Sequence, residues 1–244
     1  MRLYGLIGYP LTHSFSQQYF TEKFEKEHLD DCVFKNFPIN SISELPALLE
    51  ANSLNGLCVT IPYKEQVLEY ATTLSDEVQQ IGAANSIKIS GHTLVAYNTD
   101  TLGFEKSFTK YLKPHHKKAL VLGTGGASKA IQFVLKKLNI DFLVVSRNEA
   151  LKSNLINYDM LTESIMRQYT VVINCTPVGM WPHDDECVDI PYNSITPSHY
   201  IFDVIYKPSK TTFLKKAEEQ GATIQNGYDM LIIQAEESWK LWTK

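Results

Sequence analysis

The segment KKALVLGTGGASKAIQFVLKKL, residues 117–138, joins an apolar strand to a glycine-rich turn and then to a helix. Its glycines, Gly123, Gly125 and Gly126, would let the backbone turn tightly and approach a pyrophosphate closely, and the amides that open the helix would hold this anion. The match to G-x-G-x-x-G is incomplete, because Ser128 stands where the third glycine or alanine belongs. The alternative is a glycine-rich turn without a ligand, but the strand–turn–helix context favours a dinucleotide site.

The end of the next predicted strand indicates which dinucleotide binds. Proteins that bind NAD usually carry Asp or Glu there, to bond the ribose hydroxyls. This sequence reads VVSRN instead, and Arg147 stands 24 residues after Gly123. A guanidinium grips a 2′-phosphate through paired hydrogen bonds, whereas a carboxylate repels it. Arg147, helped by Lys152, therefore favours NADP over NAD, and the alternative is an exposed surface arginine.

Strands and helices alternate along the chain, which is typical of the α/β class. In the second half, strands are predicted at 118–122, 141–146, 171–174, 200–203 and 223–225, and helices at 101–111, 128–138, 211–220 and 228–242. In the first half, strands at 3–7, 33–37, 56–60, 84–89 and 94–97 alternate with helices at 16–28, 42–51 and 65–71. Crossovers of about a dozen residues predict mostly parallel sheets. Gly91 and His92 predict one hairpin, between the last two strands of the first half.

The length of 244 residues suffices for two modest domains. The predicted boundary lies near residue 98, which gives a mostly parallel α/β domain at 1–98 and a Rossmann-type domain at 99–228. The net charge is −4 and no long basic run occurs, so nucleic-acid binding is not indicated.

The composition also bears on location and metals. The apolar runs are much shorter than the roughly 18 residues of a membrane span, and we expect no membrane association. No secretory signal is visible at the N-terminus. The four cysteines, Cys32, Cys58, Cys175 and Cys187, form no C-x-x-C pair and match no zinc spacing. We therefore expect a reduced, cytoplasmic protein without a metal site.

Polar residues stand at or just beyond the ends of predicted strands in the first half. Ser14 and Ser16 lie in GYPLTHSFS, Lys64 ends GLCVTIPYK, Asn85 lies in GAANSI, and Asp100 ends AYNTD. Open α/β sheets bind ligands at this edge. Each residue also has an ordinary interpretation. The serines could cap the helix that begins near Ser16, and Asp100 could cap the helix that follows it. Asn85 could close a turn, and Lys64 could be a solvated lysine.

Together these stretches resemble the shikimate dehydrogenase family. The matching pieces occur in the family's order from Gly8 to Ala235: GYPLTHSFS, GLCVTIPYKE, GAANSI, YNTDTLGF, GTGGAS, INCTPVGM, FDVIYKPSKTTFLKKA and GYDMLIIQA. The resemblance implies the reversible oxidation of shikimate to 3-dehydroshikimate with NADP, a step in aromatic amino acid biosynthesis. It also implies an N-terminal substrate-binding domain, a Rossmann-type cofactor domain, and a C-terminal helix, residues 229–244, that packs back on the first domain.

The resemblance implies a role for each matching residue. Ser14 and Ser16 would bind the substrate carboxylate, and Lys64 and Asp100 would form the catalytic pair. The other residues implied to contact the substrate are Thr60, Asn85 and Gln234, at its hydroxyl groups, and Tyr206, which closes over it. Those implied to bind the cofactor are Gly123, Gly125, Gly126 and Ala127 at the pyrophosphate, Arg147 at the 2′-phosphate, and Thr176, Met180, Val204 and Gly227 near the nicotinamide half.

The sequence departs from the family's pattern at several positions. Cys58 replaces the usual Asn before Val-Thr, and Ser146 and Asn148 replace the more usual Asn and Thr beside Arg147. The chain is also shorter than typical members around residues 151–168. Two alternatives stay open: a quinate/shikimate dehydrogenase that uses NAD, and a Rossmann protein that binds a nucleotide without catalysis. The sequence does not distinguish a monomer from a homodimer.

Overall fold

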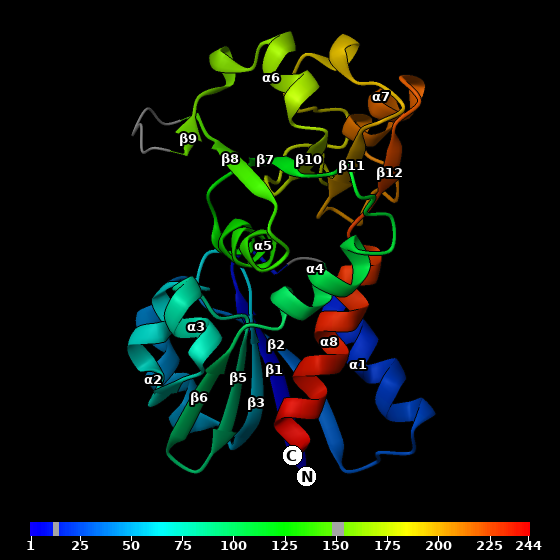
Figure 1. Ribbon diagram of the computed structural model, residues 1–244. Helices are drawn as coiled ribbons and strands as arrows, with labels where there is room; N and C mark the ends of the chain where they lie inside the picture. Colours follow the sequence, from blue (N-terminus) through cyan, green and yellow to red (C-terminus); the bar gives the residue numbers. More distant parts are fainter. Residues whose placement is uncertain (12–14, 148–153) are drawn as a thin grey trace. The chain divides into compact units, whose positions relative to one another are not determined.

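The computed structural model describes residues 1–11, 15–147 and 154–244, and it divides the chain into two compact units (Figure 1). Unit 1 comprises Met1–Thr99 together with Ala235–Lys244, and unit 2 comprises Asp100–Gln234. Each unit is built on its own six-stranded sheet. The α/β fold class predicted from the alternation of strands and helices is confirmed.

The sheet of unit 1 has the order β2-β1-β3-β5-β6-β4. Its strands are β1 (Arg2–Gly8), β2 (Cys32–Pro38), β3 (Leu54–Val59), β4 (Thr73–Leu74), β5 (Ser86–Ser90) and β6 (Thr93–Tyr97). β1 pairs in parallel with β2 and β3, whereas β5 runs antiparallel to both β3 and β6. The β5–β6 pair confirms the predicted hairpin, and Gly91 in its turn has a φ of +58°, in the left-handed region that favours glycine.

The helices of unit 1 follow the predicted pattern with three differences. They are α1 (Phe15–Lys26), a 3-10 turn (Ile42–Glu44) that leads into α2 (Leu45–Ala51), a 3-10 helix (Gln66–Tyr70), α3 (Asp76–Ile81) and the end of α8 (Tyr228–Thr243). The segment predicted as a helix at 65–71 is 3-10, because its bonds join residues three apart, such as Leu68 N to Glu65 O. The helix predicted at 42–51 begins as a 3-10 turn. The sequence did not predict α3, which is too short to show an apolar period and begins at the side-chain cap Ser75.

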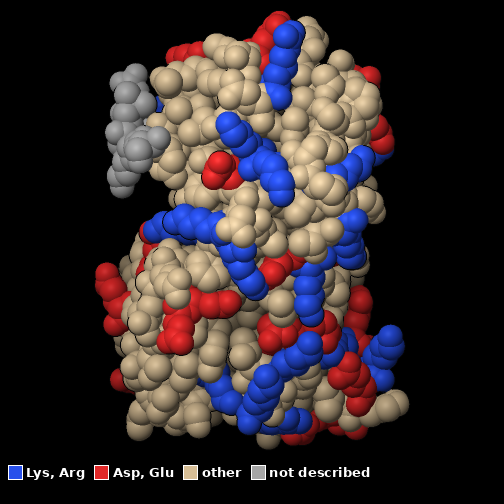
Figure 2. Space-filling view, viewed as in Figure 1, with Lys and Arg blue, Asp and Glu red and all other residues tan. Residues whose placement is uncertain are grey.

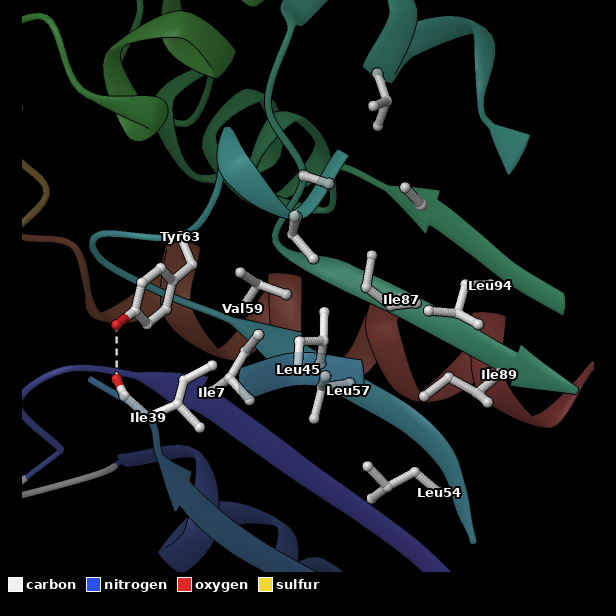
Figure 3. Close-up of a cluster of buried hydrophobic side chains, with 14 of the residues drawn as sticks. Ile7, Ile39, Leu45, Leu54, Leu57, Val59, Tyr63, Ile87, Ile89 and Leu94 are labelled. Atoms are coloured by element: carbon white, nitrogen blue, oxygen red, sulfur yellow. Dashed lines mark hydrogen bonds between the residues drawn. The ribbon is translucent and has the colours of Figure 1, made fainter. Parts of the chain in front are cut away.

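A buried apolar cluster fills one face of the unit 1 sheet (Figure 3). Ile7, Leu57 and Ile87 come from β1, β3 and β5, and each is at most 1% exposed. Tyr63 is also buried, and its hydroxyl donates a hydrogen bond of 2.6 Å to the carbonyl oxygen of Ile39. This contact anchors the segment that follows β3 and carries Lys64.

The sheet of unit 2 is entirely parallel, in the order β12-β11-β10-β7-β8-β9. Its strands are β7 (Lys118–Leu122), β8 (Asp141–Val145), β9 (Leu155–Ile156), β10 (Val171–Asn174), β11 (Tyr200–Asp203) and β12 (Thr223–Gln225). This is the doubly wound order in which dinucleotides bind at the carboxyl ends of the strands. The predicted Rossmann-type sheet is confirmed.

The helices of unit 2 differ from prediction at several ends and by one additional short helix. They are α4 (Asp100–Phe108), α5 (Gly126–Lys137), α6 (Glu163–Gln168), α7 (Thr212–Glu219) and the beginning of α8, with 3-10 turns at Tyr158–Met160 and Tyr192–Ser194. α5 begins at Gly126, two residues before its predicted start. The prediction missed these residues because glycine has a low helix propensity. The short elements β9 and α6 were not predicted.

Charged side chains of both signs are interspersed over the face of each unit that Figure 2 shows. Within the described part of the chain, no helix is both long enough and apolar enough to cross a membrane.

Candidate active site

The glycine turn leaves the N-terminus of α5 open. Gly123 has a φ of +104°, and a side chain there would also press against Thr176 Cγ2 at 3.0 Å. Gly125 is the N-cap of α5 and makes no side-chain capping bond, and a Cβ placed on it would meet no atom within 4 Å. The first amides of α5, including that of Ala127, therefore have no capping side chain on Gly125, and they lie at the positive end of the helix, where an anion is favoured.

Ser128, the departure from the glycine pattern, is accommodated inside the fold. Its side chain is fully buried in the first turn of α5, and its hydroxyl accepts a hydrogen bond of 3.0 Å from Gln132 Nε2. The local partner satisfies the extra polar group, so the turn keeps its shape without a third glycine.

The carboxyl edge of the unit 2 sheet gathers the remaining cofactor candidates. Gly123 N donates to Val145 O at 2.8 Å, and this bond ties the glycine turn to the end of β8, where Arg147 is exposed. Val204 N donates to Asn174 O at 3.0 Å, two residues before Thr176.

Two further candidates complete this edge. A side chain at Gly227 would collide with the Val204 carbonyl, so only glycine permits this approach. Met180 lies on the loop after β10 and is 43% exposed.

A buried network, which sequence reasoning missed, holds two of these strand ends together. Asp203 is fully buried at the end of β11 and accepts hydrogen bonds from Asn174 Nδ2 (3.1 Å), Ile205 N (3.1 Å) and Thr211 Oγ1 (2.6 Å). Burial raises the pKa of Asp203 to about 7, although these donors lower it. Asn174 Oδ1 in turn accepts from Thr176 N at 3.0 Å. The sequence feature that could have indicated this network is Asp203 itself, the only acidic residue at the end of the apolar strand YIFD.

In unit 1, backbone bonds bring the predicted catalytic residue Lys64 and the predicted substrate contacts Thr60 and Asn85 together near the end of β3. Thr60 N donates to Ile7 O at 3.0 Å, and Val59 N donates to Asn85 O at 2.8 Å. The carbonyl oxygen of Lys64 accepts from Ala84 N at 2.7 Å. Thr60 and Lys64 are half-buried, so both side chains lie at the surface of this edge rather than inside the core.

Asn85 is part of a second buried network. It is 4% exposed, and its amide donates to Thr99 Oγ1 at 2.9 Å and accepts from Thr99 N at 2.7 Å. Thr99 Oγ1 lies 3.0 Å from Ser238 Oγ in α8. The amide orientation of Asn85 is thus set by Thr99. The motif YNTD contains Thr99, but sequence reasoning gave it no role.

The two serines of the N-terminal stretch have different outcomes. Ser14 lies outside the described residues. Ser16 lies in the first turn of α1 and is half-buried. Because Phe15 before it is already helical, the interpretation of Ser16 as the N-cap of this helix is wrong. A hydroxyl in the first helical turn lies close to the unbonded backbone amides, which favour an anion.

The remaining candidates belong to unit 2. Asp100 is the first residue of α4 and is 5% exposed, so its carboxylate lies at the positive end of that helix. Gln234 is 9% exposed and donates from Nε2 to Leu231 O at 2.9 Å. Tyr206 follows β11 and is half-buried, and burial raises the pKa of its hydroxyl. Among the residues that the structure describes, no group of three or more His, Cys, Asp or Glu could hold a metal ion.

Residues 6–87 match the family model described as the shikimate dehydrogenase substrate binding domain. A relative named shikimate dehydrogenase (NADP(+)), from Staphylococcus haemolyticus, is 34% identical over 98% of this chain and 92% of its own length. The solved structure of shikimate 5-dehydrogenase from Thermus thermophilus, in complex with NADP(H) and shikimate, superimposes with a TM-score of 0.87 at 27% identity, over 100% of this chain and 94% of that one. A quinate dehydrogenase from Corynebacterium glutamicum in complex with NAD gives 0.86 at 25% identity, over 99% and 93%. Since the similarity extends over nearly the full length at 34% identity, the chain belongs to the shikimate dehydrogenase family.

Proposed function

We propose that this protein catalyses the reversible oxidation of shikimate to 3-dehydroshikimate with NADP. The observation that carries the proposal is the open, uncapped N-terminus of α5 behind a glycine turn, at the carboxyl edge of a parallel sheet. The relative from Staphylococcus haemolyticus is named for this activity, and its similarity spans both units. In this proposal unit 1 supplies most of the substrate contacts and unit 2 binds the cofactor.

The residues at the unit 2 edge fit NADP. The amides of Gly126 and Ala127 would hold the pyrophosphate, because Gly125 presents no side chain to cap or block them. Arg147 is exposed at the end of β8 and would pair with the 2′-phosphate. Thr176, Met180, Val204 and Gly227 would line the nicotinamide half. When bound, NADP supplies the acceptor for the hydride that leaves the carbinol carbon of shikimate.

The chain itself must take the proton that the oxidised hydroxyl loses. In the proposal, Lys64 moves this proton and Asp100 orients the lysine and the hydroxyl. Ser14 and Ser16 hold the substrate carboxylate. Thr60, Asn85 and Gln234 bond the other hydroxyl groups, and Tyr206 covers the ring. The two hydrogen bonds to Thr99 fix the orientation of the Asn85 amide. This fixed orientation supports selection among substrates by the arrangement of their hydroxyl groups.

A matrix of two substrates and two cofactors tests the proposal. Purified protein is assayed with shikimate or quinate, each with NADP or NAD, and the absorbance at 340 nm is followed. We expect the highest kcat/KM for shikimate with NADP. A preference for NAD or quinate would instead support the alternative of an NAD-dependent quinate/shikimate dehydrogenase. The alternative of a nucleotide-binding protein without catalysis predicts no absorbance change in any of the four mixtures.

A further inference from the structure

A charged cluster joins α1 to α8 within unit 1. Glu236 in α8 accepts a short hydrogen bond from the hydroxyl of Tyr19, and its two carboxylate oxygens lie 2.9 and 3.1 Å from Lys23 Nζ. Lys23 also contacts Glu27, at 2.6 Å, and its side chain is only 10% exposed. We call Tyr19, Lys23 and Glu236 the α1 clamp. α1 and α8 lie side by side in Figure 1, in agreement with these contacts.

The clamp holds the side of α1 that carries Ser16. Residues three, four and seven apart lie on one face of a helix, so Ser16, Tyr19 and Lys23 form one stripe. All three are half-buried, whereas Gln17 and Gln18 between them are exposed. The nearer contact of Glu236, to Tyr19, therefore lies on the same face of α1 as Ser16 and less than one turn from it.

Aromatic packing holds the neighbouring face of α1 separately. Phe24 lies with its ring centroid 5.2 Å from that of Trp239, and Phe20 lies 5.4 Å from Trp242. Phe20 is fully buried and Phe24 is 5% exposed. Because this apolar contact persists without Glu236, removal of the clamp should leave α1 folded and docked while its polar face becomes less ordered.

We propose that Glu236 is a positioning residue for substrate binding. Its bonds to Tyr19 and Lys23 set the rotation of the first turn of α1, and thereby the direction in which the Ser16 hydroxyl meets the substrate carboxylate. This inference rests on the proposed function of Ser16. Glu236 itself contacts neither substrate nor cofactor in this proposal, so its effect is confined to the binding of the carboxylate.

Three variants at two adjacent positions test the role of Glu236. Glu236→Ala removes both contacts, whereas Glu236→Gln keeps a carbonyl oxygen that accepts from Tyr19 and Lys23. Glu237→Ala is the matched control, since Glu237 is the next residue of α8 and contacts Lys240 at 3.4 Å instead. KM for shikimate, KM for NADP and kcat are measured for each variant, together with the melting temperature. Amide hydrogen exchange of residues 15–26 is measured on the same proteins.

We expect Glu236→Ala to raise KM for shikimate about tenfold, which corresponds to the loss of one hydrogen bond, from the Ser16 hydroxyl to the substrate carboxylate. KM for NADP and kcat should stay within about twofold of the parent, and exchange of the hydrogen-bonded amides in the second turn of α1, residues 19–22, should accelerate. Glu236→Gln should recover most of the affinity, and Glu237→Ala should behave as the parent.

Equal KM values for shikimate in Glu236→Ala and Glu237→Ala would overturn the inference, and so would a Glu236→Gln variant no better than Glu236→Ala. A fall in melting temperature with unchanged KM would also overturn it, because the clamp would then be merely structural. Failure of the proposed function gives a different result, since the parent protein itself would then not reduce NADP with shikimate.

Discussion

Two buried histidines of unit 2 should make the protein sensitive to acid. His116 and His199 are each 2% exposed. His116 Nδ1 lies 2.9 Å from Lys113 N, and its Nε2 lies 3.1 Å from Ser198 O. His199 repeats the pattern with Thr196 N and the carbonyl of Met166, both at 3.0 Å. A backbone amide can only donate and a carbonyl can only accept, so each ring must be neutral, with its proton on Nε2.

The magnitude follows from the protons that each state binds. Burial lowers the pKa of both histidines, and His115 beside His116 lowers it further. Below about pH 6.5 the unfolded chain takes up a proton on each histidine while the folded chain does not, so the free energy of unfolding falls as the pH falls. Each histidine contributes about 1.4 kcal/mol per pH unit. Between pH 6.5 and 5, both together cost at most about 3 kcal/mol, the limit in which neither ring takes up a proton in the folded chain. This limit is a large share of the typical stability of about 5–15 kcal/mol.

Urea unfolding followed by circular dichroism at pH 7.5, 6.5, 5.5 and 5.0 measures this effect. The parent is compared with the double variant His116→Gln, His199→Gln, and with His92→Gln as a control at an exposed histidine in the β5–β6 turn. The double variant should start less stable but lose less stability on acidification. If its unfolding free energy falls in parallel with that of the parent, the two histidines are protonated in the folded state and the reasoning fails.

Three further predictions concern the reaction, the cofactor and the stability of the fold. Lys64→Ala should lower kcat by about 10²–10⁴-fold with little change in NADP affinity by titration, and normal turnover would remove Lys64 from the mechanism. Arg147→Ala should raise KM for NADP by about 10–100-fold, the value of charge-assisted hydrogen bonds, without raising KM for NAD; an equal rise for both cofactors would exclude a role at the 2′-phosphate. Gly227→Ala should destabilise the protein by about 1–3 kcal/mol, because the new methyl group meets the Val204 carbonyl; an unchanged urea midpoint would contradict this.

Features that depend on neighbouring residues were predictable from sequence. The apolar run 118–122 followed by glycines predicted β7 and the turn before α5, because strand propensity and a positive φ are local properties. The alternation of strands and helices predicted a parallel sheet in unit 2 for the same reason. Short elements without a full apolar period, such as β9 and α6, were missed.

The sequence by itself determined the fold class, the glycine turn and the family, because these depend on residue types at fixed spacings. Only the tertiary structure decided which polar groups share hydrogen bonds across long separations. Asn85 meets Thr99, and Lys23 meets Glu236 more than 200 residues later in the chain. Nothing in the local pattern specifies these partners, since the order of the strands and the packing of the helices bring them together. The polar networks around the candidate site are thus products of the folded chain, although each residue in them was visible in the sequence.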